Sequence, residues 1–140
     1  MSQYAHGWLV RFDSPDLEDD QFIVTTHFVN PVTGSPIFVM FSEQMVSVGS
    51  IFSSRITDAG VHVILAIAAD TPAGAKAWRM IESGGMGLAI MSTIMVTENN
   101  VGSNIRTITQ IDMTGVLITP TPTHPGCTVS PADHVLKDTV

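Results

Sequence analysis

Residues 45–69 read MVSVGSIFSSRITDAGVHVILAIAA, and this stretch decides the fold class. Valine, isoleucine and phenylalanine recur through residues 45–56 and again through residues 61–69. Such β-branched and aromatic residues favour strands. Asp58-Ala59-Gly60 lies between the two runs and is typical of a tight turn. The stretch therefore predicts a β-hairpin, and Gly49 predicts a kink in its first strand.

Similar runs on either side of this hairpin predict a mainly β domain with about seven short strands. The other predicted strands cover residues 4–12, 21–29, 37–41, 87–97 and 105–119, the last as one strand or two. We expect 37–41 and 87–97 to be buried on both faces, because few polar residues interrupt them. Closing a sheet removes its exposed edges, so the sequence favours a small closed or partly closed β-barrel.

One segment is typical of a helix, and we expect one or two helices in all. Thr71 can accept a hydrogen bond as the N-cap, and a proline follows it at the first helical position. Ala77, Met80 and Ile81 fall on one face of the predicted helix, and that face should pack on the sheet. The glycines after Ser83 predict its end.

The composition indicates a folded domain with few surface charges. The chain has 140 residues, which suits a single domain over 1–140, with a Pro/Thr-rich extended tail over 120–140. Hydrophobic residues make up 44% of the chain and charged residues 14%. That balance excludes intrinsic disorder, which needs low hydrophobicity and high charge density. A surface so poor in charge is often covered by a partner.

The charge distribution excludes several classes of partner. The net charge is −7, and the six Lys and Arg residues are scattered along the chain, so we expect no nucleic-acid binding. No run of 18 apolar residues occurs, so we expect no membrane partner, and the N-terminal residues do not resemble a signal peptide. Residues 13–20 hold five of the thirteen acidic residues and predict a solvated loop, because they lack EF-hand spacing.

The sequence contains no recognisable catalytic, cofactor or metal motif. No two of its five histidines have metal-ligand spacing, and Cys127 is the single cysteine. A zinc site built from Cys127, His124 and His134 would lack a fourth ligand. The glycine-rich run before residue 88 lacks the lysine of a phosphate-binding loop. We therefore expect no cofactor and no metal.

Three residues are fallback candidates for nucleophilic catalysis. Ser92 is most simply a strand residue, because no GxSxG motif surrounds it. His27 and His62 alternate with apolar neighbours, so each should lie on the solvent face of a strand. If the chain were an enzyme, Ser92 would be the nucleophile and His27 or His62 its base.

The order of four segments resembles the phage prohead protease family, the capsid-maturation serine proteases distantly related to herpesvirus assemblin. Residues 6–28, from HGWLVRFDSPD to TTHF, resemble the opening strand and acidic loop of that family. Residues 48–63 resemble its glycine-containing hairpin. Residues 80–88, MIESGGMGL, resemble the helix and turn before its nucleophile strand. Residues 111–125, which contain LITPTP, resemble the ending of some members. The resemblance implies the barrel-like prohead protease fold.

The resemblance also implies where catalytic residues would stand, and inert residues occupy those positions. Ser42 or Glu43 stands where the family has its histidine. Ala89 follows Gly87-Leu88, where the nucleophilic serine is expected, and Gly115 stands near the position of the acidic residue. Loss of the members of such a triad costs several orders of magnitude in rate. The sequence thus predicts the fold of a protease without its chemistry.

The resemblance leads to a structural role as the first hypothesis for function. The protein would be a capsid decoration or cement protein, bound to the major capsid protein or other phage head proteins. It would be made in the bacterial host cytoplasm, act in many copies or as a homo-oligomer, and reside in the virion. The first alternative is a divergent prohead maturation protease, a serine endopeptidase. The second is a head-completion or neck assembly protein.

Overall fold

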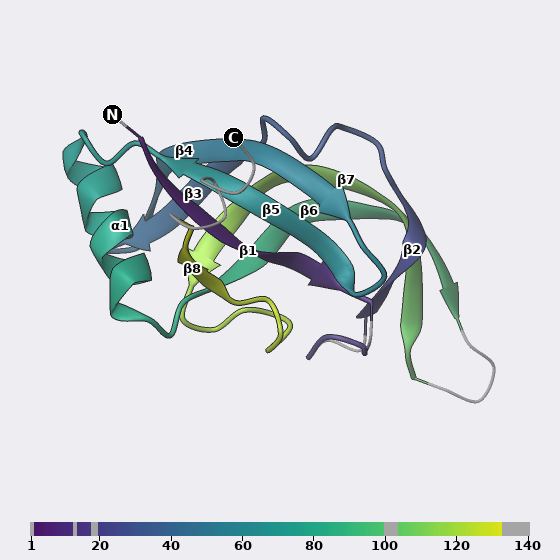
Figure 1. Cartoon of the computed structure of the whole chain (residues 1–140). Helices are drawn as coiled ribbons and strands as arrows, with labels where there is room; N and C mark the ends of the chain where they lie inside the picture. Colours follow the sequence, from purple (N-terminus) through teal and green to yellow (C-terminus); the bar gives the residue numbers. More distant parts are fainter. Residues whose placement is uncertain (1, 13, 18–19, 100–103, 133–140) are drawn as a thin grey trace.

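The computed structural model describes residues 2–12, 14–17, 20–99 and 104–132. Within these residues the chain forms eight strands and one helix (Figure 1). In chain order they are β1 (Gln3–Arg11), β2 (Asp20–Phe28), β3 (Pro36–Phe41), β4 (Gln44–Ile56), β5 (Gly60–Ile67), α1 (Pro72–Ser83), β6 (Gly87–Asn99), β7 (Arg106–Thr119) and β8 (Val129–Pro131). The predicted mainly β class with a helix is confirmed, and 105–119 forms one strand.

All eight strands belong to one sheet, in the order β2-β7-β3-β4-β5-β1-β8, with β6 paired to β7. The long strand β7 organises this arrangement. Its first half pairs in parallel with β2 and its second half in parallel with β3, while β6 pairs with it in antiparallel register along nearly its whole length. The predicted hairpin of residues 45–69 is confirmed as β4 and β5.

The sheet is not closed into a barrel, so the closed form expected from the sequence is not confirmed. Strand β8 is three residues long and pairs with β1. Beyond it, a single isolated bridge between Gly87 and Thr128 connects the start of β6 to the segment before β8. One bridge is too little for a continuous ladder, which explains why this side of the sheet stays open.

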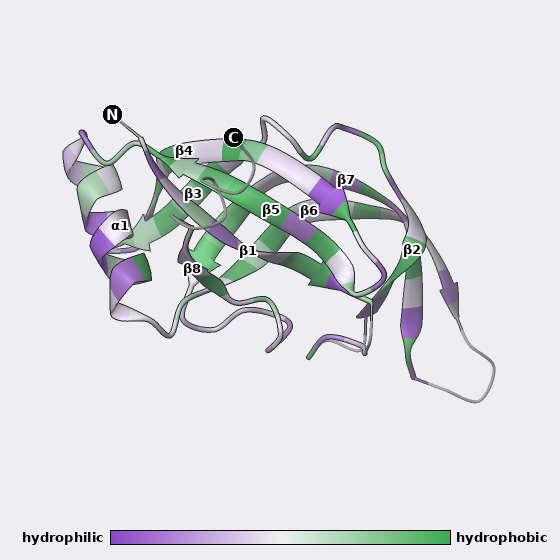
Figure 2. Ribbon diagram, in the orientation of Figure 1, coloured by the Kyte–Doolittle hydropathy of each residue, from purple (hydrophilic) through white to green (hydrophobic). Residues whose placement is uncertain are grey.

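The core lies on one face of the strands and is built by alternation. In β5, Val61, Val63 and Leu65 are buried, whereas His62 between them is half-buried on the other face. Figure 2 lets the reader follow the mixture of hydrophobic and hydrophilic residues along the strands. Each fully buried aliphatic side chain contributes about 1.5–3 kcal/mol relative to exposure.

The helix α1 forms where the sequence predicts it. The Oγ of Thr71 accepts the N–H of Gly74 at 3.0 Å, and Gly84 ends the helix with a φ of 82°. Ala77 and Ile81 are buried against the sheet, as their spacing predicts, and Met80 packs against the same core from a half-buried position. Among the described residues, no helix has the length and apolar character needed to cross a membrane.

Two strands that we expected to be buried on both faces are buried on one. Met40 in β3 is 48% exposed, and Ser92 and Thr93 in β6 are exposed. The reason is that the described part of the chain contains a single helix, which cannot cover the second face of the sheet. The described part of the 120–140 tail includes β8 at the end of the sheet, where proline is tolerated. Residues 133–140 lie outside the described residues.

Candidate functional site

The structure does not bring the fallback residues Ser92, His27 and His62 together. Ser92 lies on β6 opposite Met113, and its side chain is exposed. His27 lies on β2, and β7 separates that strand from β6. His62 lies on β5. Along the sheet β4, β3 and β7 lie between that strand and β6, and on the open side β1 lies between them.

The positions that the family resemblance singles out lie on and beside strands β3, β7 and β6. Ala89 is opposite Leu117, and Phe38 is opposite Leu117 on its other side. Gly115 is two residues before Leu117, so it shares this face, and the ring of Phe38 lies close above it. Methyl and phenyl groups therefore occupy this face, and neither an alanine nor a glycine can act as nucleophile or acid.

The position expected for the family's histidine lies in a turn. Ser42 and Glu43 connect β3 to β4, and both are exposed. Both have positive φ, 50° and 69°, as in the two-residue turns that match the twist of a hairpin. Neither residue has an imidazole, and strands β3, β6 and β7 contain no histidine.

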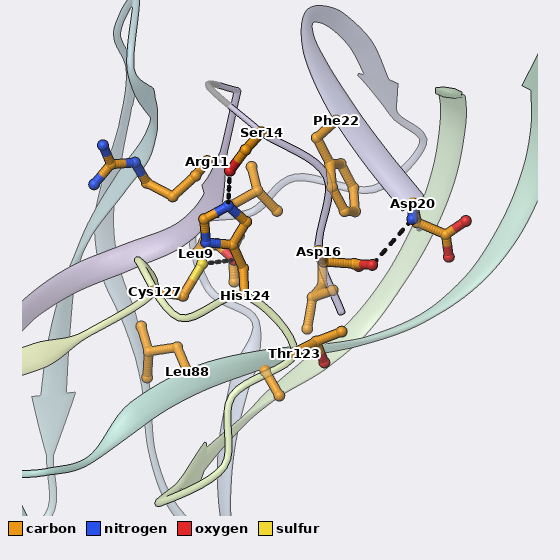
Figure 3. Close-up of a pocket in the computed structure, with 13 residues that line it drawn as sticks. Leu9, Arg11, Ser14, Asp16, Asp20, Phe22, Leu88, Thr123, His124 and Cys127 are labelled. Atoms are coloured by element: carbon orange, nitrogen blue, oxygen red, sulfur yellow. Dashed lines mark hydrogen bonds between the residues drawn. The ribbon is translucent and has the colours of Figure 1, made fainter. Parts of the chain in front are cut away.

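One serine–histidine hydrogen bond is found in the described part of the chain, at a place that the sequence did not indicate. His124, which is 9% exposed, lies in the segment between β7 and β8, and its Nε2 is 2.9 Å from the Oγ of Ser14 (Figure 3). Ser14 belongs to the acidic loop after β1. The two residues are 110 positions apart in the chain, so their contact joins the loop to the tail.

A backbone hydrogen bond selects the tautomer of the neutral imidazole of this histidine. The N–H of Gly126 donates to His124 Nδ1 at 2.8 Å, so Nδ1 must carry a lone pair. In the neutral imidazole the proton then resides on Nε2, which donates to Ser14 Oγ. A catalytic base needs the opposite arrangement, in which Nδ1 donates to a carboxylate and Nε2 accepts the serine proton. Ser14 is therefore held in place by His124 and is not activated by it.

The surroundings of this pair are those of a packed junction. The Oδ1 of Asp16 accepts the N–H of Asp20 at 3.0 Å, and Figure 3 shows its carboxylate directed toward Asp20 rather than His124. Asp20, 4% exposed, receives two hydrogen bonds from the Arg106 guanidinium at 2.7 and 2.9 Å. The cavity beside His124 measures about 20 Å³, which is room for about one water.

A pair of histidines lies on the face of β1 and β5 that points away from the core. His6 Nδ1 and His62 Nε2 are 3.1 Å apart. The ring of Trp8 meets that of His62 edge-on at 5.1 Å between centroids, and the Arg11 guanidinium lies 4.8 Å above Trp8. Burial first, then the charge on His6 and that on Arg55, lower the pKa of His62 below its ordinary value. This favours the neutral imidazole at neutral pH.

Strand alternation correctly places His62 and His27 away from the core. It cannot predict the Ser14–His124 contact or the His6–His62 contact. His6 and His62 meet because β1 lies beside β5, a neighbour relation that residue spacing along the chain does not encode. Ser14 and His124 meet through loops, for which periodicity gives no signal at all. Of the zinc ligands considered above, His134 lies outside the described residues. Within the described ones, no group of three or more His, Cys, Asp or Glu side chains gathers at one place.

The geometry thus offers a buried histidine that holds two loops together and a half-exposed histidine pair with free space beside it. Neither contains a nucleophile polarised for attack. A scan of protein-family models finds none that matches the chain, and no curated protein matches it significantly.

Proposed function

We propose that this protein is a structural component of a phage head, a decoration or cement protein bound to the major capsid protein or to other head proteins. On this proposal it uses a fold like that of the prohead proteases without their proteolytic activity. It is made in the bacterial cytoplasm and resides in the virion in many copies. The proposal draws on the motif resemblance described above and on two features of the structure.

The main support for the proposal is the identity of the side chains on the face formed by β3, β7 and β6. The positions that the resemblance assigns to the nucleophile and the acid are Ala89 and Gly115, and they share this face. A serine protease needs an imidazole within hydrogen-bond reach of its nucleophile. The histidine position instead corresponds to Ser42 or Glu43 in an exposed turn. These replacements support retention of the fold for its shape alone.

Exposed apolar side chains support a role in binding other proteins. Met40 and Met45 face each other across the β3–β4 hairpin and are 48% and 49% exposed. Methionine and aromatic residues are enriched in protein–protein interfaces, and charged residues are depleted in their cores. We call the side chains of Met40 and Met45 the hairpin tip, and propose it as part of the surface that contacts the capsid.

The bridge between Gly87 and Thr128 supports the finer description of the fold. It connects β6 to the segment that leads into β8, so the two ends of the sheet approach each other. We propose a small barrel whose neighbouring strands are joined by continuous ladders except at this bridge. It would resemble the prohead protease and assemblin fold.

Mass spectrometry of purified particles of the encoding phage tests the proposed function. We expect the intact chain in many copies per mature particle. Substitution of the hairpin tip, Met40→Lys with Met45→Lys, should reduce incorporation, because two charges would have to be desolvated at the interface. Val96→Lys is the matched control, because Val96 is similarly exposed on another strand.

Three results would contradict the proposal. Absence of the chain from mature particles would indicate a transient assembly factor. A few copies per particle would favour the head-completion or neck alternative. Capsid protein that remains uncleaved when the gene is deleted would favour the maturation protease.

A further inference from the structure

The histidine pair on the outer face of β1 and β5 brings two ring nitrogens within hydrogen-bond distance of each other. His6 and His62 are diagonal neighbours, since Trp8 is the residue directly opposite His62 and Ile64 is opposite His6. The two rings are tilted by 51° to each other, and His6 Nδ1 and His62 Nε2 lie 3.1 Å apart. At this distance one nitrogen carries the proton and the other accepts it, and either ring can be the donor.

The two ring nitrogens are spaced as two ligands of one metal ion would be. Zinc–imidazole bonds are about 2.0–2.1 Å long, so two nitrogens on one ion are about 2.8–3.4 Å apart for bond angles between 90° and tetrahedral. The observed separation of 3.1 Å lies inside that range. A bound ion would lie to one side of the line between the two nitrogens, so both rings would turn their lone pairs toward it in place of the shared proton. We propose that His6 and His62 together bind one divalent transition-metal ion, with water completing its coordination.

The choice of ion follows from the ligands. Imidazole nitrogen suits Zn²⁺, Cu²⁺ and Ni²⁺, whereas Mg²⁺ and Ca²⁺ require oxygen ligands. Among the described residues, no third His, Cys, Asp or Glu joins the pair. The ion is therefore held by two protein ligands, fewer than a structural or a catalytic zinc site has. Such an ion exchanges readily and keeps positions open for another molecule.

The surroundings provide an entry path and set the affinity. His62 lines a hollow of about 510 Å³ together with Trp8, Arg55 and Ser53, so an ion reaches the His62 member of the pair from solvent. The positive charges of Arg55 and of Arg11, which stacks on Trp8, oppose a bound cation and keep its affinity modest. The same charges favour an anionic group, such as a carboxylate, at the open positions of the ion.

The test is a titration of the full-length, tag-free protein with ZnCl₂ followed by calorimetry at pH 7.5. We expect one saturable site per chain. His6→Asn and His62→Asn should each weaken binding by at least about tenfold, because even residues that merely orient a metal ligand are worth 10–100-fold. His27→Asn is the matched control, because His27 is exposed on β2 and should leave binding unchanged. Circular dichroism verifies that each variant is folded.

A second measurement does not depend on substituting the ligands. Copper quenches nearby indole fluorescence, and the Trp8 ring is 5.1 Å from that of His62. In Trp78→Phe, which leaves Trp8 as the single tryptophan, CuCl₂ should quench the emission with the same one-to-one saturation. Absence of saturable binding, binding that persists unchanged in both His6→Asn and His62→Asn, loss of binding in His27→Asn, or copper without effect on Trp8 would each overturn the proposal.

Discussion

His124 and His62 each share a hydrogen bond with another side chain, but their environments make them opposites. His124 is buried, its Nδ1 accepts a backbone N–H, and its Nε2 donates to Ser14. Its proton therefore has a fixed location. His62 is half-buried beside an open hollow, and its partner is a second imidazole that can either give or accept a proton. Both residues are histidines, but their surroundings differ. His124 has a structural role, and on our proposal His62 is a metal ligand.

A serine and a histidine at hydrogen-bond distance do not by themselves form a catalytic pair. Ser14 and His124 lie at a distance that a catalytic pair would have, and the direction of the Gly126 N–H excludes that function. Other polar contacts also secure the loop after β1. Asp20 is held by Arg106, and the N–H of Leu17 donates to the carbonyl of Thr123 at 2.9 Å. The pair belongs to this set of contacts between loop and tail.

The largest effect on stability should come from His124→Ala. The substitution removes the hydrogen bonds to Gly126 and Ser14 and leaves the Gly126 N–H unsatisfied, so we expect a loss of about 2 kcal/mol or more in the free energy of unfolding. Ser14→Ala should cost about 1 kcal/mol, because it removes one of these bonds. Urea denaturation measures both losses.

His27→Ala is the control for that experiment, because an exposed strand residue away from other contacts should change stability by less than about 0.5 kcal/mol. If His124→Ala were as mild as this control, the structural role of His124 would be wrong, and its hydrogen bonds would have to be weaker than the geometry indicates.

A smaller effect should appear in the pH dependence of stability, measured in the presence of a chelator. The folded state lowers the pKa of His62 through burial and through His6 and Arg55. The unfolded chain therefore binds more protons than the folded chain between the lowered pKa and the ordinary value of about 6.5. The contribution of His62 to the free energy of unfolding should be fully present above about pH 6.5. It should be lost as the pH falls toward the lowered pKa.

Urea midpoints at pH 5.5 and 7.5 measure this dependence. His62→Asn should make the two midpoints more alike, whereas His27→Asn should retain the wild-type difference. An unchanged difference in His62→Asn would mean that other groups cause the pH dependence and that the His6–His62 contact does not resist protonation.

Strand pattern was sufficient to predict most of the fold, because alternation and turn chemistry are local properties. Residues 45–69, the N-cap at Thr71 and the end of the helix at Gly84 are the clearest examples. The closure of the sheet could not be predicted, since it depends on how β8 and β6 approach each other. The His6–His62 and Ser14–His124 contacts join segments 56 and 110 residues apart in the chain, and local patterns contain no information about them.

Among the described residues we find no activated nucleophile, and covalent labelling is the decisive test. The tag-free protein and its Ala89→Ser variant are incubated with a fluorophosphonate, beside an active serine protease, and are analysed by intact-mass and peptide mass spectrometry. Both should remain unmodified, at Ser14, at Ser92 and at position 89, because Nε2 of His124 donates its proton and the strands around residue 89 contain no imidazole. A stoichiometric adduct on any of these residues would show that the fold does contain an activated nucleophile.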